Sequence, residues 1–309
     1  MRYVCESEIL GLALHPREVR AAVADALVQR AQGRASLVPK VGVYPPTGGL
    51  FHAMPAAIED LVVVKWLAAG PAPRPGAPAL QSTILATDPL TGELLAVLDG
   101  AWLTGLRTAA VTALALELLR PGLRVGRAAF IGAGLQARSH LQALQDLVTL
   151  QSATVMAGRP SSADAFLGLL AERGVAGSVE ADPRRAVADA DIVITAVPFL
   201  DGVVPFVDAG WLLPTAFASA VDLGRAWIAA SYGAFTTTVT DDLEHSRAFL
   251  ASGLVAAAPR LDADLPMLLS AGPGAAAPAP GRTLLFAPGV ALADAAVARL
   301  VLRKLGLLG

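Results

Sequence analysis

The stretch RAAFIGAGLQARSHLQAL, residues 127–144, joins an apolar run, a glycine turn and an amphipathic segment. The apolar run predicts a strand, and the segment after Gly134 predicts a helix. Gly132, Gly134 and Ala137 fit the residue order of a dinucleotide-binding turn. In such a turn the first glycine permits the tight bend, the second lets the backbone approach a pyrophosphate, and the small third residue lets helix and strand pack closely. The helix would direct its free N–H groups at the phosphates.

The sequence after this turn alternates between strand and helix. Short apolar, β-branched runs predict strands, and apolar residues at three- and four-residue spacing predict helices. This alternation is typical of a parallel, doubly wound sheet, and it favours a dinucleotide site over a glycine turn that binds nothing. The predicted segments are strands at 151–158, 191–198, 215–222 and 235–242 and a helix at 162–174.

The residues on either side of this region have a different pattern, which predicts a mixed α/β part with antiparallel strands. Asp88, Pro89, Thr91 and Gly92 are suited to the turn of a hairpin. Residues 251–281 are rich in Ala, Pro and Gly and predict a loop-bearing excursion. Helices are predicted at 15–33, 104–122 and 289–306, and short strands within 36–64 and at both ends of 81–100.

Composition limits the class of protein and of partner. The 309 residues are 54% hydrophobic and 16% charged, which predicts a globular chain with one or two sizeable cores. The formal net charge of -2 leaves no basic face for nucleic acid or anionic lipid, so a small molecule is the expected partner. Four scattered histidines and one cysteine have no metal-ligand spacing, so no metal site is expected.

The location expected from the sequence is the cytoplasm. A single cysteine, Cys5, excludes an internal disulfide framework and favours a reducing compartment. Glu6 and Glu8 interrupt the N-terminal apolar segment where a signal peptide would need an unbroken core. Arg107 and Glu117 interrupt the long apolar stretch 102–119, so no membrane span is predicted.

The choice of cofactor depends on the segment TVMAGRPSSAD, residues 154–164. A carboxylate at the end of this strand would bind the ribose hydroxyls of NAD, but Ala157 and Gly158 occupy the expected position. Arg159 follows, with Ser161 and Ser162 as hydroxyl donors. Because a guanidinium matches phosphate geometry, NADP(H) is favoured and NAD(H) stays possible. The alternative is that Arg159 is a solvated loop residue.

Several segments together resemble the ornithine cyclodeaminase and mu-crystallin family. The most distinctive is TGLRTAAVTALALELL, a long helix that leads at once into the glycine turn IGAGLQA. Others are HAMPA at 52–56, VVVKW, TGELLAVLDG, ADIVITAVP, SAVD and TLLFAPGVALAD. They follow the family's order from about residue 34 to residue 304. Each motif is weak alone, but their combination over nearly the whole chain is specific.

The resemblance implies an α/β fold in which a doubly wound, Rossmann-type nucleotide domain is inserted into a mixed α/β substrate and dimerisation lobe. The lobe would comprise residues 1–120 plus 289–309, and the nucleotide domain residues 121–288. Members of the family transfer hydride between a nicotinamide and a carbon that bears nitrogen. A homodimer is expected on the same ground.

By the same resemblance, Lys65 and Arg107 are expected to bind the substrate carboxylate, and Asp222 to handle the amine or imine nitrogen. Lys65 lies in an apolar strand, where a buried cation needs an anionic partner. Arg107 is predicted in the first turn of a helix, where the helix dipole disfavours a cation. The alternatives are a lysine that snorkels from an edge strand, a structural salt bridge at Arg107, and a turn-forming aspartate before Gly224.

Two positions depart from the family pattern. Lys40 replaces an arginine that binds carboxylate in many members, which keeps the charge but loses the bidentate fork. His52 replaces an acidic residue of the ornithine enzymes, and a histidine is a poor partner for a second ammonium group. His52 is therefore either a general acid or a packed histidine beside the pocket. The remaining expected cofactor-binding residues are Thr108, Gly132, Ala133, Gly134, Leu135, Gln136, Arg159, Ala196 and Asp222.

Three functions are consistent with these residues. The preferred one is an NAD(P)-dependent oxidoreductase that acts on the C–N carbon of an imino or amino acid, as a ketimine or cyclic imine reductase or an amino-acid dehydrogenase. The second is ornithine cyclodeamination, which forms proline and ammonia with recycled NAD. The third is a crystallin-like protein that binds nucleotide without turnover, against which the presence of Lys65, Arg107 and Asp222 argues.

Overall fold

The computed structural model describes residues 1–72, 80–198, 203–253, 255, 257–272 and 280–309. It divides into two compact units. Unit 1 comprises Met1–Val111 and Gly289–Gly309, and unit 2 comprises Thr112–Pro288. Helix α3 (Ala101–Leu119) contributes residues to both units. The boundary thus falls within this helix, whereas the sequence placed it after residue 120.

Unit 1 contains a seven-stranded sheet that is mostly antiparallel, as the sequence indicated. Its strand order is β1-β7-β6-β5-β4-β2, and β3 pairs with β4. The only parallel pair among these strands is β1 with β7. The strands are β1 (Arg2–Val4), β2 (Ser36–Leu37), β3 (Val41–Val43), β4 (Leu50–Ile58), β5 (Leu61–Ala69), β6 (Gln81–Thr87) and β7 (Leu94–Asp99).

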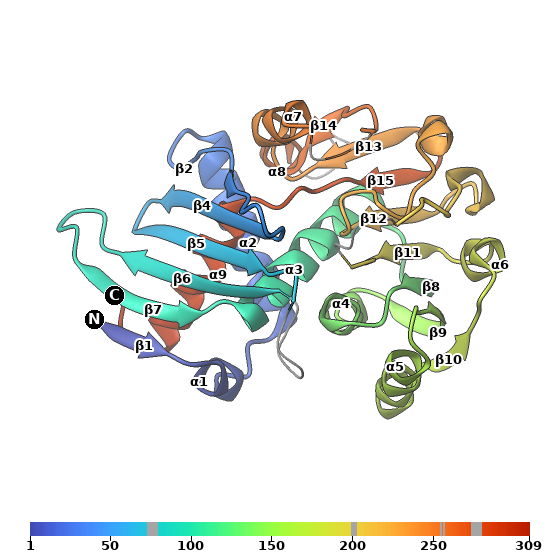
Figure 1. Cartoon of the computed structure of the whole chain (residues 1–309), viewed down its shortest axis with the longest axis horizontal. Helices are drawn as coiled ribbons and strands as arrows, with labels where there is room; N and C mark the ends of the chain where they lie inside the picture. The colour runs from blue at the N-terminus through green and yellow to red at the C-terminus, as the bar shows by residue number, and fades with distance from the viewer. Residues whose placement is uncertain (73–79, 199–202, 254, 256, 273–279) are drawn as a thin grey trace. The chain divides into compact units, whose positions relative to one another are not determined.

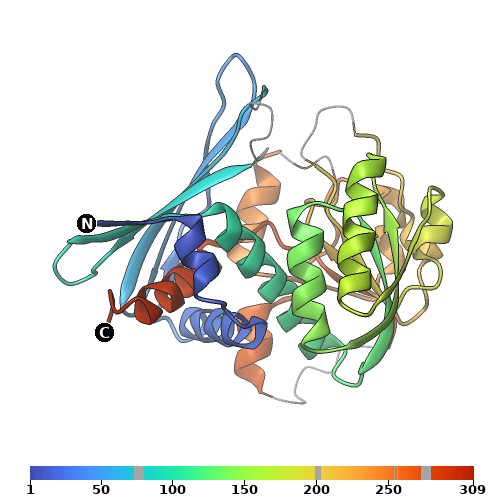
Figure 2. The same ribbon diagram turned by 90° about the horizontal axis from the view of Figure 1, so that it is seen from below.

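One face of this sheet is covered by helices α2 (Pro16–Ala31) and α9 (Ala291–Lys304), which pack against each other and against β4 (Figure 2). Burial alternates along β4, β5 and β6, so that every second side chain points at these helices. Lys65 belongs to the inward set of β5, a central strand. The alternative of a snorkelling lysine on an edge strand is therefore wrong. The short helix α1 (Glu6–Gly11) follows β1.

Two features of unit 1 were predicted from the sequence, the hairpin around Asp88 and the long helix α3. The hairpin is confirmed, because Asp88 accepts N–H bonds from Leu90 and Thr91 and joins antiparallel β6 and β7. Helix α3 begins earlier than Thr104, because the Asp99 carboxylate accepts the Ala101 N–H at 3.1 Å. Arg107 consequently lies beyond the first turn of α3, so the argument from the helix dipole was wrong.

Helix α3 is the one helix of the described residues with the length and apolar composition to cross a membrane. Of its most apolar window, 78% is buried inside the protein, which is typical of a core helix. Its apolar character is explained by packing.

Unit 2 contains an eight-stranded sheet in which every pair of neighbouring strands is parallel. The strand order is β10-β9-β8-β11-β12-β15-β13-β14 (Figure 1). The strands are β8 (Val125–Ile131), β9 (Thr149–Met156), β10 (Ala176–Val179), β11 (Ile192–Thr195), β12 (Phe217–Ala220), β13 (Thr237–Thr240), β14 (Ala263–Asp264) and β15 (Thr283–Leu285). This arrangement confirms the predicted doubly wound, Rossmann-type fold.

The strand order of unit 2 reverses direction between β8 and β11. From β8 the chain proceeds outward to β9 and β10, then returns to β11 and continues on the other side. Ligands of open α/β sheets bind outside the carboxyl ends of the strands at such a reversal. The glycine turn after β8 therefore lies where this fold binds its ligands. The connecting helices are α4 (Leu135–Gln145), α5 (Pro160–Glu172), α6 (Pro183–Val187), α7 (Leu243–Ala251) and α8 (Leu265–Ala271), with 3-10 turns at Ala209–Trp211 and Ala229–Ala234.

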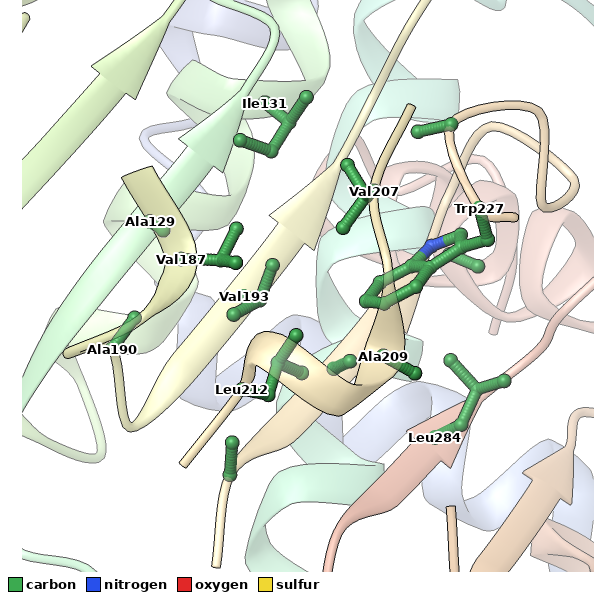
Figure 3. Packing of buried hydrophobic residues seen from close by; sticks show 14 of the residues in the cluster. Ala129, Ile131, Val187, Ala190, Val193, Val207, Ala209, Leu212, Trp227 and Leu284 are labelled. Atoms are coloured by element: carbon green, nitrogen blue, oxygen red, sulfur yellow. The ribbon is translucent and has the colours of Figure 1, made fainter. Parts of the chain in front are cut away.

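The hydrophobic core on one side of this sheet is built around Trp227 (Figure 3). Its indole ring is 1% exposed and packs edge-on against Phe235, with ring centroids 5.3 Å apart. Small residues on the strands, such as Ala129 and Ala218, belong to the same buried cluster, and close packing of this kind is typical of protein interiors. The indole N–H donates to the Thr195 hydroxyl at 3.0 Å, which fixes the side chain at the end of β11.

Some elements of the structure did not follow from the sequence pattern. Strand β10, helix α6 and the first strand of the chain are short and lack a clear period. The expected excursion at 251–281 holds β14 and α8, while 254, 256 and 273–279 lie outside the described residues.

Candidate active site

The glycine turn after β8 meets the end of β11. Gly132 has φ of +114°, a conformation that L side chains rarely adopt, and a Cβ here would lie 2.5 Å from the carbonyl oxygen of Ala196. Its N–H donates to the carbonyl of Met156, the last residue of β9. Only glycine fits this position, so the backbone can bend tightly and connect three neighbouring strands.

The other residues of the turn fit a dinucleotide as well. A Cβ on Gly134 would meet nothing within 4 Å, so its backbone can be approached closely. Gly134 is also the N-cap of α4 and offers no side-chain bond to the N–H groups of the first turn. Ala137 is fully buried between helix and sheet. The turn thus has the three features that pyrophosphate binding needs, a tight bend, an approachable backbone and a helix N-terminus without a side-chain cap.

The neighbouring candidates in this turn have different exposures. Ala133 is buried, and Leu135 is 39% exposed at the start of α4. Gln136 is half-buried, and its carbonyl is hydrogen-bonded to His140 at 2.7 Å. Ala196 is half-buried and donates its N–H to Ile131 at 2.7 Å. These residues lie at the sheet reversal, as a role in binding cofactor requires.

The residue expected to select the cofactor lies at the end of β9, the strand next to the glycine turn. Arg159 is exposed, has an extended backbone, and is the N-cap residue of α5. Ser161 is exposed and Ser162 half-buried in the first turn of that helix. The two residues between Met156 and Arg159 are Ala157 and Gly158, neither of which has a carboxylate. These positions are compatible with a 2′-phosphate, and the preference for NADP(H) stays a prediction.

Asp222 lies just after β12 and is 6% exposed. One carboxylate oxygen accepts from the Thr195 hydroxyl at 3.0 Å and from the Gly224 N–H at 3.2 Å, and the other accepts from the Val197 N–H at 3.4 Å. Burial raises the pKa of Asp222 to about 6, although these hydrogen bonds oppose the shift. The bond to Gly224 is that of a turn-forming aspartate, yet the raised pKa also equips this carboxyl for proton transfer near neutral pH.

In unit 1, Lys65, Arg107 and Asp294 form what we call the buried charge cluster. Lys65 is fully buried, and its Nζ donates to Oδ1 of Asp294 at 2.9 Å. The Nε of Arg107 lies 3.3 Å from the same oxygen. Desolvation, and secondarily the positive charge of Arg107, lowers the pKa of Lys65 to about 8, while Asp294 opposes the shift. The cluster brings together the two residues expected to bind a carboxylate.

His52 is the other buried titratable group near Lys65. It is 3% exposed on β4, and its Nε2 is hydrogen-bonded to the Tyr44 hydroxyl at 3.1 Å. Burial, then the charges of Lys40 and Lys65, lower the pKa of His52 to about 4. Because the imidazole is neutral at pH 7, it is not a ready source of protons. Gly42 makes room for the tyrosine, since a Cβ there would overlap the ring of Tyr44.

Two further residues of the predicted site, Lys40 and Thr108, lie in unit 1. Lys40 is half-buried just before β3 and is close enough to influence His52 electrostatically. Thr108 is half-buried on α3 in unit 1, where its hydroxyl donates to the Thr104 carbonyl at 2.7 Å. That bond is local to the helix and leaves the predicted cofactor role of Thr108 untested.

Sequence reasoning missed Asp294, Thr195 and Tyr44. Asp294 had a detectable signal, because it is the one acidic residue in the apolar segment GVALADAAV, residues 289–297. Thr195 ends an apolar strand and had no distinguishing pattern. Among the described residues, no group of three or more His, Cys, Asp or Glu side chains is arranged to hold a metal ion.

The fold and these residues define a two-unit α/β protein, one unit of which has a Rossmann-type sheet with a dinucleotide-type turn. The model of the ornithine cyclodeaminase/mu-crystallin family matches residues 5–226, and the chain belongs to this family.

The chain is also similar to individual curated proteins and to solved structures. An alanine dehydrogenase of Archaeoglobus fulgidus is 29% identical over 74% of this chain and 70% of its own length. A ketimine reductase mu-crystallin of Macropus fuliginosus is 31% identical over 57% of this chain and 55% of its own length. The solved dimer of an archaeal alanine dehydrogenase with bound NAD has a TM-score of 0.81 and 24% identity, covering 98% of this chain and 95% of that one. At this identity the structural likeness shows the fold.

Proposed function

We propose that this protein is an NAD(P)-dependent oxidoreductase that adds hydride to the C=N carbon of an imino acid or runs the reverse oxidation of an amino acid. The observation that carries the proposal is Asp222, a buried carboxyl with a pKa of about 6 at the carboxyl end of a Rossmann-type sheet. The relatives of this chain include an alanine dehydrogenase and a ketimine reductase, both named for chemistry at a carbon that bears nitrogen.

The buried charge cluster supports a substrate with a carboxylate. Lys65 and Arg107 each carry +1 and Asp294 carries −1, so the cluster has a formal charge of 1 + 1 − 1 = +1. A net positive charge in a desolvated place is costly unless an anion neutralises it. One substrate carboxylate would do so, and would fix the orientation of the imino carbon.

Asp222 supplies the proton chemistry of the proposal. Reduction adds one hydride to carbon and one proton to nitrogen, and oxidation removes both. A bound nicotinamide supplies the hydride. With a pKa of about 6, the Asp222 carboxyl can hold a proton and release it near neutral pH, where general acids and bases are most effective. Thr195, Gly224 and Val197 hold its two oxygens in place.

The glycine turn and the end of β9 support the choice of cofactor. The turn at Gly132, Gly134 and Ala137 would hold the pyrophosphate, because it bends tightly, has an approachable backbone and leads into a helix N-terminus without a side-chain cap. Arg159, with Ser161 and Ser162, favours NADP(H), since a guanidinium forms charge-assisted bonds to a 2′-phosphate. NAD(H) stays possible, because the archaeal structure of the same fold holds NAD.

Reduction is preferred to ornithine cyclodeamination because of His52. A diamino acid would bring a second ammonium group, which an acidic residue stabilises. His52 is neutral at pH 7, bonded to Tyr44, and already under the influence of Lys40 and Lys65. A second cation at this position would be repelled.

The decisive experiment is a substrate screen with either reduced nicotinamide. Δ1-pyrroline-2-carboxylate and Δ1-piperideine-2-carboxylate should be reduced with stoichiometric loss of the absorbance of the reduced nicotinamide, because one hydride is consumed per product. Formation of proline and ammonia from ornithine without net cofactor change would establish cyclodeamination instead. Tight dinucleotide binding without turnover of any imino, amino or diamino acid would establish a binding protein.

We further propose that unit 1 forms a homodimer through the outer face of its sheet. Across that face Pro55, Val64, Leu85, Val97 and Tyr3 lie opposite one another on five strands. Leu85 is 40% and Tyr3 59% exposed. Pro55, Val64 and Val97 are half-buried, and a row of partly exposed apolar side chains is typical of an interaction surface. The archaeal alanine dehydrogenase of the same fold is a dimer.

Light scattering after size-exclusion chromatography tests the dimer. The unmodified protein should have twice the mass of one chain, and Leu85→Lys should shift it to one chain, because a charge in an apolar interface costs more than it gains. A single-chain mass for the unmodified protein would contradict the proposal. Location in the cytoplasm stays a prediction from the single cysteine, Cys5.

A further inference from the structure

Asp294 holds a fully buried carboxylate on helix α9, and one of its oxygens is shared by two cations. Oδ1 lies 2.9 Å from Nζ of Lys65 and 3.3 Å from Nε of Arg107. Oδ2 is buried without a hydrogen-bond partner among the described residues. The three side chains come from three elements, β5, α3 and α9. A single carboxylate oxygen therefore sets the distance between two positive groups.

The local backbone is built to permit this arrangement. Gly289, just before α9, has φ of +93°, and a Cβ there would lie 2.9 Å from a guanidinium nitrogen of Arg107. A glycine at this position thus lets Arg107 approach the start of the helix that carries Asp294. Lys65 pairs in register with Met54 and Ile84, so its strand neighbours offer it no anion.

We propose that Asp294 is a positioning residue, which holds the Lys65 ammonium and the Arg107 guanidinium together so that both bind one substrate carboxylate. The proposal rests on the proposed function, because it takes the substrate to be a carboxylate. Asp294 touches neither substrate nor cofactor in this scheme. It acts through Lys65 and Arg107 by fixing their positions and by keeping Lys65 charged.

The charged and titratable groups around Lys65 determine what removal of Asp294 would do. Arg107 on α3 influences Lys65 electrostatically, Asp294 on α9 is the anion bonded to it, and His52 on β4 is a neighbour whose own pKa is lowered by Lys65. Arg107 disfavours a charged lysine, His52 is neutral at pH 7, and only Asp294 among these three favours the charged form. Without the negative charge of Asp294, the Lys65 ammonium should therefore lose its proton at a lower pH.

The first test reads the charge of Lys65 directly and needs no substrate. The chain contains three lysines, Lys40, Lys65 and Lys304, so protein labelled with ¹³C at the lysine Cε gives few signals. The Lys65→Met variant assigns the signal of interest. Asp294→Asn should lower the titration midpoint of Lys65 by at least about one pH unit, because the favourable charge is gone. Asp60→Asn is the matched control, since Asp60 binds Arg299 and Arg303 on the same helix and should leave the midpoint unchanged.

The second test separates positioning from chemistry. With the imino acid found in the screen, Asp294→Asn should raise KM at least about tenfold and change kcat less than about threefold, because carboxylate binding is lost and hydride transfer is not. The pH above which kcat/KM falls should decrease together with the titration midpoint of Lys65. An equal rise of KM in Asp60→Asn would mean that the weaker substrate binding of Asp294→Asn is a structural effect, and would overturn the proposal.

A double variant keeps the proposal testable if Asp294→Asn does not fold. Lys65→Met/Asp294→Asn removes one cation and the anion together. In the Lys65→Met background Asp294 can act only through Arg107, so the double variant should bind pyrrole-2-carboxylate more weakly than Lys65→Met, but by less than the loss of about tenfold expected when both cations are released. A loss of about tenfold or more would show that Asp294 does not act through Lys65. This binding is measured by calorimetry, so an unmodified protein that binds the carboxylate but reduces no imino acid would refute the proposed function and leave the role of Asp294 standing.

Discussion

In unit 1 the buried carboxylate Asp294 lies between two cations, whereas in unit 2 the buried carboxylate Asp222 is surrounded by neutral donors. Asp294 is bonded to Lys65 and lies near Arg107. Asp222 accepts from the hydroxyl of Thr195 and from backbone N–H groups, and burial raises its pKa to about 6. The comparison teaches that the partners of a buried carboxyl group decide its role. Asp294 is the counter-ion of two cations, whereas Asp222, held by neutral donors, has a raised pKa that suits proton transfer.

The largest effect should come from removal of the Asp222 carboxyl. Asp222→Asn should lower kcat about 10²- to 10⁴-fold, because the group that exchanges a proton with nitrogen is gone. Dinucleotide affinity should change much less. Steady-state kinetics and calorimetric cofactor binding measure the two quantities. Asp182→Asn is the control, since Asp182 also accepts backbone N–H bonds but caps helix α6. A loss of kcat below tenfold would remove Asp222 from the chemistry.

The second prediction concerns stability and tests whether the two carboxylates differ. Asp294→Asn leaves two buried cations without an anion and should lower the free energy of unfolding by about 3–5 kcal/mol. Lys65→Met/Asp294→Asn should recover much of that loss, because one of the cations is gone. Denaturant unfolding measures both variants. If the double variant is no more stable than Asp294→Asn, charge compensation is not what Asp294 provides.

The third prediction is the pH dependence that Asp222 should impose. Its pKa is raised from 3.8 to about 6 on folding, so between these values the unfolded chain has lost a proton that the folded protein retains. Stability therefore falls as pH rises through this window. The shift of about two units corresponds to at most about 3 kcal/mol, to order of magnitude.

Denaturant unfolding at about pH 4 and pH 7 measures this slope, and Asp222→Asn provides the reference. The difference between the two proteins isolates the contribution of one carboxyl from all others. Equal slopes in both proteins would mean that Asp222 titrates normally, and the contrast between the two carboxylates would be lost.

The sequence predicted more of unit 2 than of unit 1, for a physical reason. The dinucleotide turn is encoded locally, since Gly132, Gly134 and Ala137 lie within six consecutive residues and Gly132 has a backbone conformation that side chains rarely adopt. The predicted parallel sheet followed from the strand and helix periods, and the family motifs agreed with it.

The buried charge cluster is encoded across the whole chain. Lys65 and Asp294 are 229 residues apart, so no local pattern connects them. The sequence required an anion for a buried lysine and proposed the substrate, but the structure supplies Asp294 as a partner within the chain. The protonation state of His52 was also unpredictable, because it depends on burial and on the charges of Lys40, just before β3, and Lys65, on β5. Spatial neighbours, and not residue types, decide these properties.

The smallest expected effect concerns the exposed cation of unit 2, in contrast to the buried cations of unit 1. Arg159 is exposed at the start of α5, so its contact with a 2′-phosphate would be screened by water and salt. Arg159→Asp should cost NADP(H) about 1.5–3 kcal/mol, or roughly 10- to 150-fold in affinity, because a charge-assisted bond is replaced by repulsion. NAD(H) has no 2′-phosphate and should be affected much less. Dissociation constants of both cofactors measure the effect, and Arg173→Asp at the other end of the helix is the control. If the unmodified protein binds NADH at least as tightly as NADPH, or if Arg159→Asp weakens both equally, Arg159 does not select the cofactor.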